Sequence, residues 1–294
     1  MSNANIPCPR LPSQHVGEFS ITAISDGYLD ASLDFLANIT PPEAAHIQSA
    51  AGISNPASIH INCYLIRGRG RTILIDAGAG GLNQWGGELE ANLALAGVQP
   101  ADIDTILLTH AHPDHIGGLL TASGEMAFAN AELVVHQREL AFWKDDGHLG
   151  QASERARGNF LFARRMFERY RNNLRPFTSN DVLPGISAMP LPGHTVGHCG
   201  YRLDSVAGNL LIWGDIVHFP QIQIARPDVT IAFDHDPMLS AATRTKLLDV
   251  ACSDNLMVAG MHLGALGFAR IKRVGNDYSI AYEPLAAGKQ ELSC

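Results

Sequence analysis

Ten residues of this 294-residue chain, Thr109 to Gly118, constrain its fold and chemistry more than any other stretch. They read T-H-A-H-P-D-H-I-G-G and follow a short apolar segment, Thr105–Leu108, that predicts a buried strand. A loop that leaves a strand end can turn several side chains toward one point. Imidazole and carboxylate groups are ligands that divalent transition metals take. We therefore predict metal binding by four residues of this loop: His110, His112, Asp114 and His115.

Three further candidate ligands lie at the ends of predicted strands. His194 lies in P-G-H-T-V-G-H, Asp215 follows L-L-I-W-G, and His262 follows G-M. Each residue alone would be unremarkable, because an isolated histidine is usually a hydrogen-bonded core or surface residue. Together with the first loop they supply five histidines and two aspartates, enough for two metals that share one carboxylate. Two metals about 3.5–4 Å apart can deprotonate a water molecule and polarise a substrate oxygen.

Composition excludes several other classes of function. The formal net charge is −8 and no run of Lys or Arg occurs, so nucleic acid and anionic membranes are poor partner candidates. The five cysteines are scattered without a C-x-x-C, which favours reduced thiols. We see no apolar signal segment and no run of the roughly 18–20 apolar residues that spans a bilayer, and we expect a cytoplasmic protein. No G-x-S-x-G, G-x-G-x-x-G or P-loop occurs.

The order of predicted elements indicates an α/β or α+β sandwich. We expect an N-terminal arm over residues 1–16 and a single hydrolase domain over 17–294. Predicted strands cover residues 18–25, 59–67, 72–76, 105–108, 132–136, 186–191, 201–203, 209–213 and 256–259, and the first of them ends at an Asp26-Gly27 turn. Predicted helices cover residues 88–97, 138–144, 151–174 (one helix or a pair) and 238–250.

The motif T-H-x-H-x-D-H-x-G-G, with the three later ligands behind it in order, resembles the metallo-β-lactamase superfamily. The resemblance covers the chain from about Phe19 onward and implies an αββα sandwich, two packed mixed sheets flanked by helices, with the metals at one edge. It assigns one metal to His110, His112 and His194, and a second metal to Asp114, His115 and His262. Asp215 would bridge the two. Zinc is the first choice of metal, with iron, manganese and cobalt open, and relatives imply a homodimer.

Departures from several branches narrow the resemblance. The commonest metallo-β-lactamases carry a Cys where this chain has Asp215, and flavodiiron proteins carry a Glu in place of His112. Acyl-homoserine lactonases carry a Tyr in place of His218. The chain most resembles the branch of methyl parathion hydrolases and dihydrocoumarin hydrolases, through G-E-F-S-I-T-A-I-S-D-G, I-L-I-D-A-G-A-G-G-L, D-V-L-P-G-I and the Phe142-Trp143 pair.

That branch implies a pocket walled by aromatic residues, to which we assign Trp143 and Phe160 (or Phe162). Phosphotriester specialists have a small aliphatic residue at the position of His218. The bulkier wall expected here, formed by His218, Ile231 and Phe233, favours lactones and aryl esters. His218 could donate a hydrogen bond to substrate or only line the pocket.

We expect hydroxide to attack a lactone carbonyl, with Asp215 bridging the metals and Asp114 shuttling a proton. Weak phosphotriesterase activity is an expected side reaction. Asp76 is expected to tie loops together and His198 to lie outside the ligand shell. The alternatives are an organophosphate hydrolase, an acyl-homoserine lactonase and a glyoxalase II-type thioester hydrolase using Arg270, Lys272 and Arg273. The remaining alternative is not an enzyme: a metal-binding or redox-sensing module without turnover.

Overall fold

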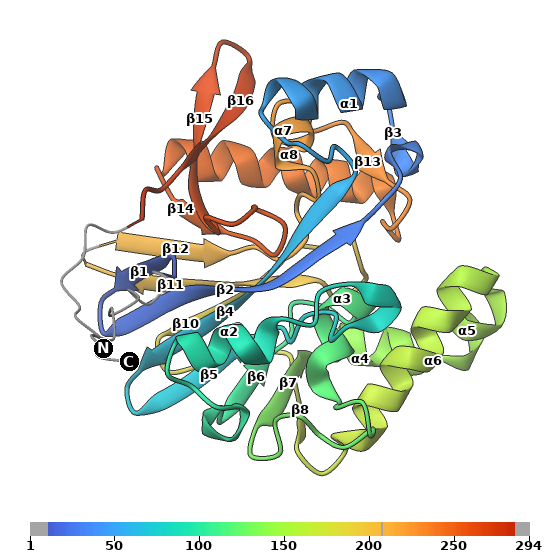
Figure 1. The fold of residues 1–294 in the computed structure, drawn as a ribbon, viewed down its shortest axis with the longest axis vertical. Helices are drawn as coiled ribbons and strands as arrows, with labels where there is room; N and C mark the ends of the chain where they lie inside the picture. The colour runs from blue at the N-terminus through green and yellow to red at the C-terminus, as the bar shows by residue number, and fades with distance from the viewer. Residues whose placement is uncertain (1–10, 207, 286–294) are drawn as a thin grey trace, which may run out of the picture.

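A computed structural model describes residues 11–206 and 208–285 (Figure 1). Within these residues, two seven-stranded mixed sheets pack face to face. The first sheet contains, in spatial order, β1 (Ser13–Val16), β2 (Phe19–Asp30), β4 (Ser58–Gly68), β5 (Arg71–Ile75), β6 (Thr105–Leu107), β7 (Glu132–His136) and β8 (Leu174–Phe177). The second contains β16 (Asp277–Tyr282), β15 (Phe268–Val274), β14 (Met257–Ala259), β12 (Gly208–Ile212), β11 (Cys199–Ser205), β10 (Ile186–Pro190) and β9 (Asp181–Leu183). A two-residue ladder joins β3 (Leu36–Ala37) to β13 (Thr230–Ile231).

Helices cover both outer faces of the pair of sheets (Figure 1). On the side of the first sheet lie α2 (Leu89–Leu95), α3 (Pro113–Ile116), α4 (Gln137–Lys144), α5 (Asp146–Gln151) and α6 (Glu154–Arg169). On the other side lie α1 (Pro41–Ala50), α7 (Pro220–Gln223) and α8 (Pro237–Ser253). Short 3-10 turns are η1 (Leu33–Phe35), η2 (Leu82–Gln84), η3 (Pro100–Asp102) and η4 (Gly117–Leu119). No helix in the described part of the chain is long and apolar enough to cross a membrane.

Alternation along the strands explains the layers. In β5, Ile73 and Ile75 belong to the core between the sheets, whereas Leu74 belongs to the core under the first layer of helices. In β12, Leu210 and Ile212 likewise face the first sheet, and the residue between them faces α8. Successive strand side chains point to opposite faces, so a strand buried on both faces reads as a continuous apolar run. The αββα sandwich that the family resemblance implied is confirmed.

Parallel pairing brings the functional loops to one edge. β5 pairs in parallel with β6, and β12 pairs in parallel with β14. The carboxyl ends of parallel strands meet at the same edge of a sheet, which is where α/β proteins bind ligands. The loops after β5, β6, β12 and β14 carry Asp76, the first histidine motif, Asp215 and His262 respectively.

Several predicted boundaries differ from the observed ones. β2 continues through the predicted Asp26-Gly27 turn to Asp30 with a bulge between Ser25 and Gly27. The buried Asp26 carboxylate accepts the backbone N–H groups of Ala79, Gly87 and Leu89, which holds the strand in place there. Residues 13–16, expected in the N-terminal arm, form β1 and pair with β2, and residues 1–10 lie outside the described range.

The helical stretch predicted over 151–174 is divided at Ala152. The Ser153 side chain caps the second helix, α6, by accepting the N–H of Ala156. That helix ends at Arg169, and β8 begins within the predicted helical range. The β15–β16 hairpin, which completes the second sheet, was not predicted.

Candidate metal centre

The first histidine motif begins in the tight loop after β6 and continues into α3, which contains Asp114 and His115. Pro113 occupies the first turn of α3, where its missing N–H leaves no hydrogen bond unmade. The two glycines after the motif let the loop approach the segment after β5. A Cβ on Gly117 would lie 2.1 Å from the Ala79 carbonyl oxygen, and one on Gly118 would lie 2.1 Å from the Ala77 carbonyl oxygen. Only glycine fits at these two positions without a shift of backbone.

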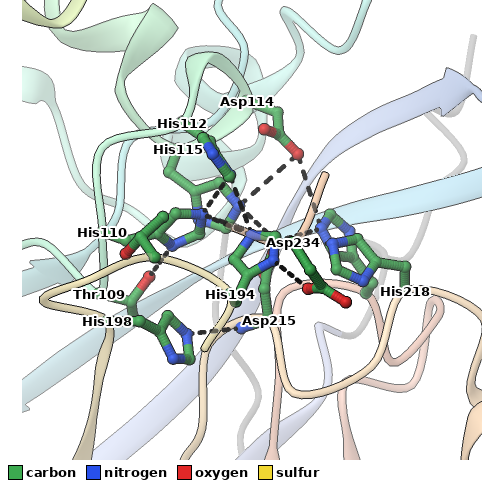
Figure 2. Close-up of polar contacts among 12 residues, drawn as sticks. Thr109, His110, His112, Asp114, His115, His194, His198, Asp215, His218 and Asp234 are labelled. Atoms are coloured by element: carbon green, nitrogen blue, oxygen red, sulfur yellow. Dashed lines mark hydrogen bonds and ion pairs between the residues drawn. The ribbon is translucent and has the colours of Figure 1, made fainter. Parts of the chain in front are cut away.

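Three imidazole nitrogens converge to form the first cluster. His110 Nε2 lies 3.1 Å from His112 Nδ1, which lies 2.9 Å from His194 Nε2. The triangle closes with 3.2 Å between the Nε2 atoms of His194 and His110. His194 enters from the loop after β10, so the cluster joins the edges of both sheets (Figure 2).

A second cluster lies beside the first and is centred on one carboxylate oxygen. Asp215 Oδ2 lies 3.1 Å from the Nε2 atoms of both His115 and His262. It also lies 3.4 Å from His194 Nε2, so it faces both clusters. Asp114 Oδ2 completes the second cluster at 3.6 Å from His115 Nε2 and 3.5 Å from His262 Nε2. All seven candidate ligands of the sequence analysis are thus brought together.

Hydrogen bonds from the far side of three rings fix which nitrogen faces inward. His115 Nδ1 bonds the carboxylate of Asp76 at 2.7 Å, and His194 Nδ1 bonds that of Asp234 at 2.9 Å. His262 Nδ1 donates to the backbone carbonyl of His60 at 2.7 Å, an atom that can only accept. Outer partners of this kind set the tautomer and orientation of a metal-binding imidazole.

Asp76 ties two loops together, and His198 lies outside both clusters, as the sequence analysis expected. Besides His115, the Asp76 carboxylate accepts the backbone N–H and the hydroxyl of Thr109, both at 2.7 Å. The Thr109 hydroxyl in turn contacts His110 Nδ1 at 3.0 Å. His198 Nδ1 donates to the Leu191 carbonyl, and its Nε2 accepts the backbone N–H of Asp215. Both residues therefore position candidate ligands without joining either cluster.

Glu139 of α4 links the two loops of the first cluster. Its Oε1 accepts the N–H of Ala111 at 3.0 Å and the indole N–H of Trp143 at 2.6 Å. Its Oε2 accepts the Thr195 hydroxyl at 2.7 Å and the Gly197 N–H at 2.9 Å. The side chain is fully buried, and its four donors hold the motif loop against the His194 loop.

Burial, hydrogen bonds and neighbouring charges shift the pKa values of the ionisable groups in this site. Burial lowers the pKa of His110 and of His112 well below the usual value, which keeps both neutral. Burial also lowers the pKa of His194, but hydrogen bonds to Asp215 and Asp234 outweigh it and raise that pKa to about 9. Despite burial, the histidine charges hold the pKa of Asp215 well below its ordinary range.

These groups fit divalent cations. Three ring nitrogens that lie within hydrogen-bond distance of one another cannot all be satisfied by hydrogen bonds among themselves, whereas one cation can bind all three. The inward nitrogens of His115 and His262 face carboxylates in the same way. The buried Oδ1 of Asp215 has no hydrogen-bond partner within the described residues. Nitrogen ligands bound at about 2.0–2.1 Å to one tetrahedral zinc lie about 3.3 Å apart, near the observed spacing. The donor set, five imidazoles and two carboxylates, matches zinc and its first-row neighbours.

The two clusters open into a cavity of about 920 Å³. Asp114, His112, Asp215 and His262 reach this cavity. Trp143 and Phe160, predicted as its aromatic wall, do line it, with ring centroids 4.7 Å apart, and Phe162 and Trp85 line it as well. The basic residues weighed for a glutathione site, Arg270, Lys272 and Arg273, lie on β15 and do not line it.

The second predicted wall is present only in part. His218 and Phe233 line the cavity with ring centroids 5.9 Å apart. Ile231 does not line it, because it lies on β13, where its side chain is 1% exposed and packs in the core with Leu36. His218 Nε2 lies 3.3 Å from Asp215 Oδ2, and burial lowers the pKa of His218 to about 4, so this ring is neutral near pH 7.

Sequence reasoning missed two residues that support the candidate ligands, Asp234 and Glu139. Asp234 lies 40 residues after its partner His194, and no periodicity relates the two positions. Glu139 lies on a helix in a pattern that reads as an ordinary solvated face. The one available signal is the position of Asp234 in an F-D-H-D segment that precedes a helix.

Comparisons with known proteins agree with this geometry. The sequence profile described as the metallo-beta-lactamase superfamily matches residues 59–262. The uncharacterized protein YobT of Bacillus subtilis (strain 168) is 29% identical over 156 residues, which make up 53% of this chain. The chain spans 62% of the length of that curated relative.

Solved structures of similar fold cover nearly the whole chain. Hydrolase AbOPH in the beta lactamase superfamily superposes with a TM-score of 0.87 at 26% identity, covering 96% of this chain and 99% of that one. AidC, a dizinc quorum-quenching lactonase solved in complex with the product N-hexanoyl-L-homoserine, gives 0.86 at 24% identity, covering 94% and 98%. A probable metal-dependent hydrolase from Staphylococcus aureus gives 0.75 at 22% identity, covering 92% and 99%.

Proposed function

Because the chain belongs to the metallo-beta-lactamase superfamily, we propose that it is a metal-dependent hydrolase that opens lactones, in particular aryl lactones such as dihydrocoumarin, and cleaves aryl esters. The observation that carries this proposal is the convergence of seven candidate ligands in two clusters, four of whose residues reach an aromatic-lined cavity. The printed description of AidC as a dizinc lactonase adds support for zinc and for lactone substrates.

In this proposal the ligands divide as the two clusters do. His110 Nε2, His112 Nδ1 and His194 Nε2 would hold one metal. Asp114, His115 and His262 would hold the other, and Asp215 would be shared through Oδ2. When bound, two such cations lower the pKa of water from 15.7 toward about 7 and polarise a carbonyl oxygen.

The remaining steps belong to the chain's own side chains. Trp143, Phe160 and Phe233 would hold the apolar ring of the substrate and exclude water around it. The Asp114 side chain is 15% exposed, whereas that of Asp215 is 2% exposed. Asp114 therefore has room to take a proton from water and return it to the departing alkoxide or phenoxide. A phenoxide needs little such help, which suits aryl lactones and aryl esters.

His218 would set the preference for planar carbonyl substrates over phosphotriesters. Its neutral ring stacks on that of His262, with centroids 5.2 Å apart and an interplanar angle of 23°. It therefore narrows the cavity directly beside Asp215. A phosphotriester carries three substituents around a tetrahedral phosphorus and needs more room there than a flat lactone.

The test compares two substrates on one zinc-loaded preparation. We expect kcat/KM for dihydrocoumarin to exceed that for dimethyl 4-nitrophenyl phosphate by well over tenfold, and chelation to abolish both rates. A ratio below one would assign the protein to the organophosphate hydrolases instead. The third substrate is N-hexanoyl homoserine lactone, whose hydrolysis gives the product bound in AidC. A higher kcat/KM on this lactone than on dihydrocoumarin would show that the protein prefers aliphatic lactones.

A further inference from the structure

A single arginine at the rim of the cavity has no role in the chemistry described so far. Arg155 lies in the first turn of α6 and lines the cavity. Among the described residues that line it, Arg155 is the one lysine or arginine. Its guanidinium makes no hydrogen bond or ion pair with any described side chain. The acidic residues that line the same cavity are four aspartates: Asp30, Asp114, Asp215 and Asp234.

Two aromatic rings fix the guanidinium in place. Its central carbon lies 4.5 Å from the ring centroid of Phe233 and 5.2 Å from that of Phe35. The two rings contact each other with centroids 5.4 Å apart. They come from distant segments that are tied together by the β3–β13 ladder and by the Ala232 N–H, which donates to the Phe35 carbonyl. Backbone pairing therefore holds the two rings next to each other under Arg155, although the arginine and Phe35 are both exposed.

Stacking on a platform occupies the faces of a guanidinium and leaves its N–H edges open. Partial burial also lowers the pKa of Arg155, a sign that the group has lost part of its water. An arginine edge presents donors in a planar fork that matches a carboxylate with two parallel hydrogen bonds. Weak hydration makes such a fork better than a lysine ammonium for this role.

The platform also connects the arginine to the candidate metal ligands. Phe233 contacts Arg155 on one side and the His218 ring on the other. The next residue, Asp234, hydrogen-bonds His194. The rings of Phe233 and His218 thus link the guanidinium to Asp215, since His218 Nε2 lies 3.3 Å from Asp215 Oδ2.

We propose that Arg155 is a specificity-determining residue that binds a carboxylate carried by the substrate on the side away from the scissile ester bond. This inference rests on the proposed hydrolase function and names its preferred substrates: aryl esters and lactones with a remote carboxylate. The aromatic walls hold the ring between the two charged ends.

A matched substrate pair tests the proposal on the zinc-loaded protein. 4-Acetoxybenzoate and its methyl ester differ in charge at the far end of the ring and share the same acetyl ester. We expect R155Q to lower the kcat/KM ratio of acid to methyl ester by about fivefold to tenfold, as for a partly exposed charge-assisted pair. R155K should keep part of the preference. R157Q is the matched control, because it removes an equal charge two residues further along α6 from a side chain that does not line the cavity. It should leave the ratio unchanged.

Binding to the metal-free protein gives a second readout that needs no turnover. We expect saturation-transfer NMR to detect 4-hydroxybenzoate on the wild type and on R157Q, with a signal much reduced on R155Q, and a weaker signal from methyl 4-hydroxybenzoate throughout. An unchanged substrate ratio in R155Q, or an equal fall in R157Q, would overturn the inference while leaving the hydrolase proposal intact. Loss of chelator-sensitive turnover on both esters would overturn the hydrolase proposal, and the binding measurement would then decide on Arg155 alone.

Discussion

Replacing Asp234 with Asn should weaken metal binding without changing any of the seven ligands. The Asp234 carboxylate is buried and accepts from His194 Nδ1 at 2.9 Å, which aims Nε2 into the first cluster. Removing an outer carboxylate of this kind typically lowers metal affinity about 10- to 100-fold. We therefore expect D234N to lower zinc affinity by that factor at alkaline pH.

The size of the effect should depend on pH in a defined direction. In the metal-free protein the pKa of His194 is about 9, so at pH 7 the ring must lose a proton before it binds metal. Two pH units correspond to about 2.7 kcal/mol. The hydrogen bond to Asp215, which also raises that pKa, remains in D234N, so the substitution lowers the pKa of His194 only in part and removes part of this cost. The deficit in zinc affinity should therefore be smaller near pH 7 than near pH 9.

Competition against a fluorescent zinc chelator at pH 7 and pH 9 measures this deficit. D236N is the matched control, because Asp236 caps α8 through the Leu239 N–H and Asn caps a helix equally well. Equal affinity of D234N and wild type at pH 9, or an equal loss in D236N, would refute the view that Asp234 orients His194.

Three further predictions follow from the same geometry. Zinc should raise the melting temperature more at pH 9 than at pH 6.5. The raised pKa of His194 stabilises the metal-free fold below about pH 6.5, and that stability is lost as the pH rises through 9, so the metal-free protein is the weaker reference at pH 9. A zinc-induced shift in melting temperature, measured by scanning calorimetry, that becomes smaller as the pH rises would contradict this. E139A should lower the free energy of unfolding by about 2–4 kcal/mol, measured in urea, because four donors lose their buried acceptor, and a loss below about 1 kcal/mol would show that the loops hold without it. H218A should raise kcat/KM for dimethyl 4-nitrophenyl phosphate relative to dihydrocoumarin by about tenfold, since it widens the cavity beside Asp215, whereas an unchanged ratio would remove His218 as a specificity element.

The seven residues of the candidate site could be picked out from the sequence because their signal is local. Four of them lie within six consecutive positions, and the other three each follow a short apolar run that predicts a strand end. The order of predicted strands and helices indicated an α/β or α+β sandwich, and the resemblance to the metallo-β-lactamase superfamily implied its αββα layers. The strands β5 and β12 are buried on both faces, so their apolar runs alone do not show which residue faces which layer.

The supporting residues could not be predicted because their partners are set by tertiary packing. Asp234 and Glu139 act on loops that are distant in sequence, and no spacing rule connects them. Ile231 was assigned to the cavity wall, but pairing of β13 with β3 turns it into the core and leaves Phe233 at the surface of the cavity. The Asp26-Gly27 pair has the composition of a turn, and the three N–H groups that keep it in a strand come from residues 79–89.

The most direct test of the account is a titration of zinc into the metal-free protein, followed by the rate of dihydrocoumarin hydrolysis. The account predicts that two zinc ions bind per chain and that the rate reaches its maximum only at the second equivalent. D215N should lack this maximum because both clusters lose the negative carboxylate that they share. A rate that saturates at one equivalent, or that persists in excess chelator, would contradict the two-metal site.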